Sequence, residues 1–118
     1  MRYLVVEDND ELRETLALML EAPGRHVDTC ASGEQALEVF GRSPYAVVLA
    51  DVGLPGLSGI ELARRLRLRS PDTWLILCSG ALLDGPADDP SARTRVLMKP
   101  FSIEALEQLL DEVEATGR

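Results

Sequence analysis

Charged and hydroxyl-bearing side chains stand directly after four of the short apolar runs in this sequence. Glu7 and Asp8 follow the first run, Asp51 the third, Ser79 the fourth and Lys99 the fifth. Carboxylates, an ammonium group and a hydroxyl donor that meet at one place can hold a hard divalent cation and stabilise the oxygens of a phosphoryl group during its transfer. Whether these side chains meet depends on the elements that carry them.

The apolar runs themselves are short, and four of the five are nearly continuous. They cover residues 3–6, 26–31, 46–50, 74–78 and 95–98. Continuous runs of this length are typical of strands that are covered on both faces. We therefore expect five strands in a largely buried sheet.

Helical patterns separate most of these runs. After Asp10 the apolar residues Leu12, Leu16, Met19 and Leu20 form one stripe, and Pro23-Gly24 ends it. Three serines are expected to cap the amino ends of helices. Ser32 with Gln35 and Ser58 with Glu61 form capping boxes, and Ser102 can cap the last helix.

The alternation of strand and helix predicts parallel strands with helices on both faces. Five strands in this arrangement fit the flavodoxin-like, doubly wound (βα)5 sheet with strand order 2-1-3-4-5. In that order the carboxyl ends of the first and third strands are neighbours, which puts Glu7, Asp8 and Asp51 side by side. Three crowded carboxylates repel one another, and Mg²⁺, or Mn²⁺ in its place, would relieve the repulsion.

Composition limits the partners and the compartment. The length of 118 residues predicts a single domain, residues 1–118, and the chain has 46% hydrophobic residues and a net charge of −8. An acidic surface argues against direct binding of nucleic acid or of an anionic membrane. Cys30 and Cys78 lie in apolar runs without metal-ligand spacing, so we expect buried free thiols in a cytoplasmic, reducing environment. We find neither a signal peptide nor a span of membrane length.

Each of these features also has a simpler interpretation. A lone aspartate after a strand is usually a turn or a helix cap, and Lys99 or Ser79 alone would be ordinary surface or turn residues. These interpretations explain the residues singly. They do not explain why all of them are expected at one edge of the sheet, the rim formed by the carboxyl ends of the strands. The arginines at 64, 65, 67 and 69 form either a solvated helix face or a docking patch for an acidic partner.

The set of motifs resembles the response-regulator receiver domain, the CheY-like family of two-component signalling. The matching pieces are VVEDN at residues 5–9, DVGLPGLSG at 51–59, CSG at 78–80 and KPF at 99–101. Their order and approximate spacing agree with the family along essentially the whole chain, and the set is far more specific than any single piece.

The resemblance implies roles for the residues of the rim. Asp51 would be the phosphoacceptor, taking a phosphoryl group from a phosphohistidine of a sensor kinase. Glu7, Asp8, Asp51 and the backbone carbonyl of Gly53 would bind Mg²⁺, with Glu7 acting directly or through water. Lys99 would pair with the phosphoryl oxygens.

The resemblance also implies a switch. Ser79 would bond the phosphoryl group and move on activation, and a cis bond before Pro100 would aim Lys99. The family usually has an aromatic residue three positions before the lysine, where this chain has Val96. The aromatic part of the usual switch is therefore in doubt.

A second departure lies in LLDGPADDPSAR, residues 82–93, where the family has its fourth helix. Pro86, Pro90 and Gly85 disfavour a helix there, so we expect it to be short, irregular or absent. The family's common dimer through this helix should then be weakened or replaced. We expect a monomer or a weak, phosphorylation-dependent dimer.

Three functions fit the pattern to different degrees. The first is a phosphoacceptor receiver that signals to a protein effector or a fused output domain, fed by a histidine kinase or a phosphotransfer protein. It would catalyse its own phosphorylation and dephosphorylation, without turnover of a separate substrate. The second is a pseudo-receiver whose interactions do not depend on phosphate. The third is a small hydrolase or phosphatase on a related α/β sheet, which the lack of an acid in VGLPG, residues 52–56, disfavours.

Overall fold

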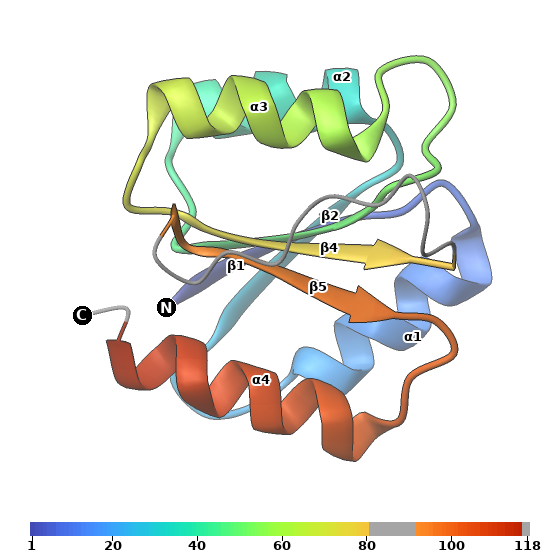
Figure 1. The fold of residues 1–118 in the computed structure, drawn as a ribbon, viewed down its shortest axis with the longest axis vertical. Coiled ribbons are helices and arrows are strands. Elements are labelled where there is room, and N and C mark those ends of the chain that lie inside the picture. The colour runs from blue at the N-terminus through green and yellow to red at the C-terminus, as the bar shows by residue number, and fades with distance from the viewer. Residues whose placement is uncertain (81–91, 117–118) are drawn as a thin grey trace.

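The computed structural model describes residues 1–80 and 92–116 and forms one five-stranded sheet with helices on both faces (Figure 1). The strands are β1 (Arg2–Val6), β2 (His26–Cys30), β3 (Val47–Asp51), β4 (Trp74–Ser79) and β5 (Thr94–Met98). The helices of the described residues are α1 (Asp10–Leu20), α2 (Gly33–Arg42), α3 (Gly59–Arg69) and α4 (Ile103–Thr116).

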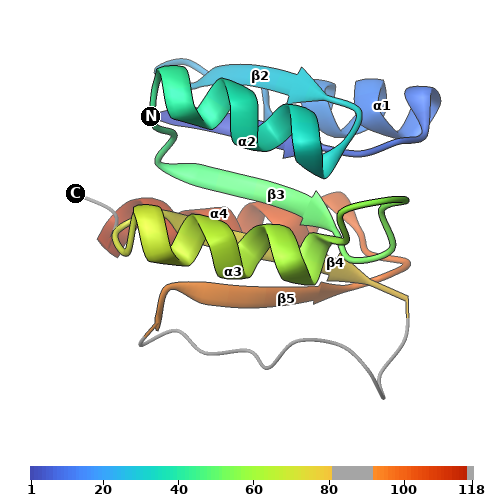
Figure 2. The same ribbon diagram turned by 90° about the horizontal axis from the view of Figure 1, so that it is seen from above.

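The sheet has the order β2-β1-β3-β4-β5 and every neighbouring pair is parallel, which confirms the predicted topology. Helices α1 and α4 cover one face, and α2 and α3 cover the other (Figure 2). The central strands β3 and β4 are buried along nearly their whole length, whereas the edge strands β2 and β5 are only partly buried. Burial on both faces explains why the central runs are continuously apolar.

Two apolar layers hold the helices to the sheet. Tyr3, Val5, Leu49 and Ile76 point toward α1 and α4 and pack in one cluster with side chains of those helices. The alternate residues of the same strands pack with α2 and α3 in the other cluster. The period of two along each strand therefore divides its side chains between the two layers.

Polar side chains fix where the helices begin. The hydroxyls of Ser32, Ser58 and Ser102 accept hydrogen bonds from the backbone N–H groups of Gln35, Glu61 and Ala105. The predicted caps are therefore confirmed. Asn9 caps α1 in the same way, because its side-chain oxygen accepts a hydrogen bond from the N–H of Leu12. The sequence patterns above do not predict this cap.

The sequence predicts that the family's fourth helix, expected over residues 82–93, is short, irregular or absent. Most of this segment, up to residue 91, lies outside the part of the chain that the structure describes. That prediction therefore stays a prediction. Within the described residues, none of the helices has both the length and the apolar character needed to cross a membrane.

The arginines of α3 do not share one environment. Arg64 and Arg65 are exposed and pair with Glu61 on the same helix. Arg67 instead turns toward the start of β4 and β5. It donates to the carbonyl oxygens of residues 71, 73 and 93 and to the Thr94 hydroxyl. Neither a solvated face nor a docking patch describes Arg67, which ties α3 to the ends of two strands.

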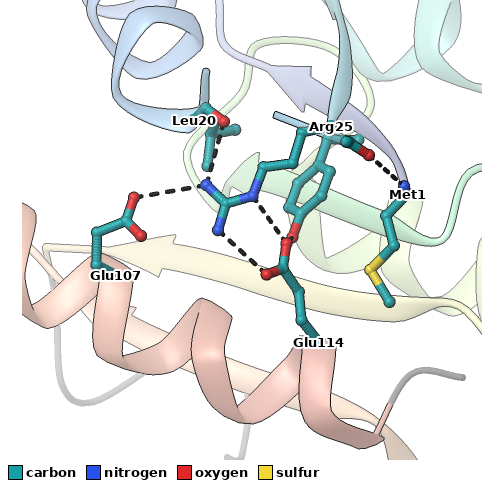
Figure 3. Close-up of polar contacts among 7 residues, drawn as sticks. Met1, Leu20, Arg25, Glu107 and Glu114 are labelled. Atoms are coloured by element: carbon teal, nitrogen blue, oxygen red, sulfur yellow. Dashed lines mark hydrogen bonds and ion pairs between the residues drawn. The ribbon is translucent and has the colours of Figure 1, made fainter. Parts of the chain in front are cut away.

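A second anchor lies at the amino end of the strands, beside the start of β2, and Figure 3 shows its polar contacts. The Arg25 side chain is 8% exposed, and its guanidinium donates to both carboxylate oxygens of Glu114 at 2.8 and 3.3 Å and to the carbonyl oxygen of Leu20. Glu107 lies 3.5 Å from the same guanidinium, and the Tyr3 hydroxyl donates to Glu114. The cluster joins β1, the loop before β2, and α4.

Glu114→Gln should lower the free energy of unfolding by about 2 kcal/mol at pH 7, because Arg25 loses its charged acceptor in a half-buried place. Hydrogen bonding from Arg25 lowers the pKa of Glu114 below its ordinary 4.5. The stabilisation is therefore fully present above pH 4.5 and is lost as the pH falls through the folded-state pKa. Urea unfolding at several pH values measures both effects.

The matched control is Glu38→Gln, which removes a carboxylate from the well-exposed pair with Arg42. It should change the stability by less than about 0.5 kcal/mol. If Glu114→Gln cost no more than Glu38→Gln at pH 7, Arg25 and Glu114 would not anchor α4.

Candidate functional site

The carboxyl ends of four parallel strands bring the predicted site residues to one rim. Glu7 follows β1, Asp51 ends β3, Ser79 ends β4 and Lys99 follows β5. The register places Val6 beside Ala50 and pairs Asp51 with Cys78, so these ends lie level with one another. Parallel pairing thus converts positions far apart in the sequence into neighbours.

Three carboxylates gather at the rim. Oxygens of Glu7, Asp8 and Asp51 lie within 4.8 Å of one another, with Glu7 buried, Asp51 half-buried and Asp8 exposed. Burial raises the pKa of Glu7, against the hydrogen bond that its carboxylate accepts from the N–H of Asn9 at 3.0 Å. A compact group of hard oxygen ligands with one face open to solvent fits a cation such as Mg²⁺.

Lys99 supplies the positive charge from the other side of the rim. Its Nζ lies 3.0 Å from Oδ1 of Asp51 and 3.8 Å from Oε1 of Glu7. Burial by itself would lower the pKa of Lys99, but the hydrogen bond to Asp51 and the two negative charges outweigh burial and raise it. Lys99 therefore stays protonated and can meet an additional anionic group at Asp51.

The backbone around Lys99 is tied to Ser79. The N–H of Lys99 donates to the carbonyl oxygen of Ser79 at 2.8 Å, and the bond between Lys99 and Pro100 is cis, as the family resemblance implied. Ser79 itself is 3% exposed. Val96 lies three residues before Lys99 in β5, opposite Leu77 of β4, and is partly buried.

Cys78 is the register partner of Asp51, and it is a free, buried thiol like Cys30. Burial raises the pKa of Cys78 to about 12. The thiol consequently stays protonated at neutral pH and is a poor nucleophile, since the thiolate is the reactive form.

Gly59 is a residue of the site that sequence reasoning missed. A Cβ added to it would lie 2.2 Å from the carbonyl oxygen of Asp51, so only glycine lets α3 begin this close to β3. The N–H of Gly59 donates to the carbonyl oxygen of Val52, whose own N–H donates to Cys78. The glycine directly after the Ser58 cap was the available signal. Gly53 lies on the same loop, its Cβ position 3.8 Å from Oδ2 of Asp51.

An apolar groove of about 520 Å³ opens beside the rim, and the sequence had not indicated it. Helix α1 forms one wall and the residues after β5 form the other. It is lined by Leu12, Thr15, Leu16, Met19, Lys99, Pro100 and Phe101. Lys99 belongs to both the rim and the groove, so a molecule seated in the groove would lie next to Asp51.

Comparison with known proteins decides the family. The family model described as the response regulator receiver domain matches residues 3–111. The chain is a receiver domain. The receiver protein CpdR of Brucella abortus is 35% identical over 115 residues, which cover 96% of this chain and 93% of CpdR. The transcriptional regulatory protein TcrA of Mycobacterium tuberculosis is 37% identical, and the match spans 90% of this chain but 43% of TcrA.

A solved structure gives the same fold and a relevant ligand. The response regulator TrrA of Thermotoga maritima in complex with Mg²⁺ and BeF has a TM-score of 0.83 and 30% identity to this receiver, over 95% of this chain and 97% of TrrA. TrrA was also solved in complex with the histidine kinase ThkA, with a TM-score of 0.81, the same identity and the same shares of both chains.

Removal of one carboxylate from the receiver should reveal the repulsion at its rim. Asp8→Asn leaves Lys99 with Asp51 and Glu7, so without metal we expect it to raise the free energy of unfolding by about 1 kcal/mol. The same variant should lose most of the stabilisation that Mg²⁺ gives the wild type. Thermal unfolding with EDTA and with Mg²⁺ measures both.

Glu11→Gln is the control, because it removes an exposed charge from the first turn of α1 outside the carboxylate group. Without metal, it should not raise the free energy of unfolding. With Mg²⁺, it should be stabilised as much as the wild type is. A wild type and an Asp8→Asn variant that respond equally to Mg²⁺ would contradict a cation site at these carboxylates.

Proposed function

We propose that this receiver takes a phosphoryl group from a sensor histidine kinase, or from a phosphotransfer protein, onto Asp51 and signals the change to a protein partner. An oxygen of the Asp51 carboxylate attacks phosphorus, a P–O bond forms and the P–N bond to the imidazole breaks. The imidazole leaves neutral, with its other nitrogen protonated. The observation that carries the proposal is the contact of Lys99 with Asp51 inside a group of three carboxylates.

The cation expected here is Mg²⁺, or Mn²⁺ in its place, held by the side chains of Asp8 and Asp51 and the carbonyl of Gly53, with Glu7 acting directly or through water. When bound it would neutralise negative charge on the transferring phosphoryl oxygens. Lys99 would hold those oxygens from the opposite side, and its raised pKa supports this role. In dephosphorylation a water oxygen would attack phosphorus, the bond between phosphorus and the Asp51 oxygen would break, and inorganic phosphate would leave, so the domain would catalyse its own dephosphorylation without a separate substrate.

The switch residues form part of the same proposal. The Ser79 hydroxyl would bond the phosphoryl group at the end of β4, and Pro100 would keep Lys99 aimed at Asp51. Val96 would transmit a change in packing without the reorientation of a ring. The downstream partner would be a protein effector or a fused output domain, in a monomer or a weak dimer that depends on phosphorylation. Direct nucleic-acid or membrane contact is not expected.

The compartment is also a proposal. We infer a cytoplasmic protein, supported by the two buried free thiols, which suit a reducing environment.

Phosphorylation by a small donor tests the chemistry. With radiolabelled acetyl phosphate and Mg²⁺, the wild type should take up label, whereas Asp51→Asn should take up none because the attacking carboxylate is gone. Lys99→Ala should keep Mg²⁺ binding but lose at least about 10-fold in labelling rate, as expected for loss of a charge that stabilises the transition state. Equal labelling of the wild type and Asp51→Asn would refute Asp51 as the phosphoacceptor.

The groove is the surface that we propose for the kinase, because it adjoins Asp51 through Lys99. Thr15→Arg should obstruct the groove and slow transfer from a histidine kinase that phosphorylates the wild type by about 10-fold or more, while labelling by acetyl phosphate stays unchanged. Leu18→Arg is the control, because Leu18 lies on the same helix but outside the groove lining and its side chain is 66% exposed. This substitution should change neither transfer rate.

The transfer rates from the kinase and from acetyl phosphate separate docking from chemistry. A loss with both donors would indicate damage to the rim. Unchanged transfer from the kinase would move the docking surface away from α1.

Val96 favours one alternative, a pseudo-receiver that binds its partner independently of phosphate. Amide hydrogen exchange with and without beryllofluoride distinguishes the two. A switch predicts changed exchange in β4 or β5, whereas labelling of Asp51 without any change in exchange or partner affinity would support the pseudo-receiver.

A further inference from the structure

The loop between β3 and α3 touches the first turn of α2. The closest approach is at Gly33, where an added Cβ would lie 2.8 Å from the carbonyl oxygen of Leu57 and 3.1 Å from its Cβ. Gly33 is buried, and its neighbour across the gap is backbone, which cannot swing aside as a flexible side chain can. The absence of a side chain at Gly33 therefore sets how near the loop lies to α2.

Glu34, the next residue, makes a polar contact with the same loop. Its Oε2 accepts a hydrogen bond from the N–H of Leu57 at 3.2 Å. The same oxygen lies 2.8 Å from where a Cβ of Gly56 would be, and Gly56 has a φ of +71°, which favours glycine. Two residues of α2 thus fasten the turn formed by Gly56 and Leu57.

The fastened turn is close in the chain to the cation site. The loop leaves the rim at Asp51, passes Gly53 beside the Asp51 carboxylate and reaches Leu57 four residues later. At its base the loop is fixed by the hydrogen bonds of Val52 with Cys78 and Gly59. Gly53, whose carbonyl would be a cation ligand, lies between Val52 at the base of the loop and the turn at Gly56 and Leu57 that α2 holds.

We propose that Gly33 and Glu34 are positioning residues for this loop and that they set the affinity of the rim for Mg²⁺ by holding the Gly53 carbonyl in place, an inference that rests on the proposed function. Neither residue is a ligand. Groups that orient ligands commonly change metal affinity when they are removed. Because coupling between two sites is reciprocal, bound Mg²⁺ must in turn strengthen the contact between Glu34 and Leu57.

Titration with Mg²⁺ alone tests the proposal. Glu34→Ala and Gly33→Ala should weaken Mg²⁺ binding by about 2- to 10-fold, the range expected for loss of one hydrogen bond or a small shift of a ligand. Glu34→Gln keeps an acceptor without the charge and should stay within about 2-fold of the wild type. It thereby separates the hydrogen bond from simple attraction between Glu34 and the cation.

Gly41→Ala is the control for Gly33→Ala, since Gly41 lies in the same helix and a Cβ there would meet nothing within 4 Å. It should bind Mg²⁺ like the wild type. If Gly33→Ala does not fold, the comparison of Glu34→Ala with Glu34→Gln decides the question alone.

Hydrogen exchange at the Leu57 amide gives a readout that does not depend on phosphorylation. We expect Mg²⁺ to slow this exchange in the wild type and in Glu34→Gln but not in Glu34→Ala. The proposal is overturned if Glu34→Ala and Gly33→Ala bind Mg²⁺ like the wild type while Asp51→Asn does not bind it. If Asp51→Asn binds Mg²⁺ as well as the wild type does, the proposed cation site fails first, and the positioning role fails with it.

Discussion

The rim of this receiver depends on a balance of charge. Three carboxylates share a space less than 5 Å across, and Lys99 reaches two of them. Burial raises the pKa of Glu7, which makes this carboxyl harder to ionise than it would be in water. The protein keeps this unfavourable group because the surrounding sheet and loops hold its members in place. Phosphorylation would add more negative charge to the same balance and thereby alter it.

The rest of the fold fixes the positions of the rim residues. Parallel pairing brings the four strand ends level, and the close approach of Gly59 lets α3 start directly behind Asp51. At the opposite end of the sheet, Arg67 and Arg25 tie helices to strand ends. These two arginine anchors therefore lie away from the rim, whereas the rim itself is held by the contacts of Lys99 with Asp51 and Glu7 and by hydrogen bonds of the loop backbone.

Sequence patterns were sufficient for features that depend on local chemistry and on topology. The strand order, the serine caps and the gathering of Glu7, Asp8 and Asp51 all follow from periodicity and from the rules for parallel sheets. Features made by long side chains across distant segments could not be predicted in this way. Arg25 and Glu114 are 89 residues apart, and each alone resembles an ordinary surface residue. Similarly, Gly33 and Leu57 meet only because the fold brings the loop between β3 and α3 against the first turn of α2.

A crystal structure of the protein with Mg²⁺ and beryllofluoride would test the central claim most directly. We predict Mg²⁺ bound by Asp8, Asp51 and the carbonyl of Gly53, beryllofluoride on Asp51, and Lys99 in contact with its fluorines. Beryllofluoride that is absent from Asp51 at saturating concentration, or Mg²⁺ bound away from these carboxylates, would contradict the account.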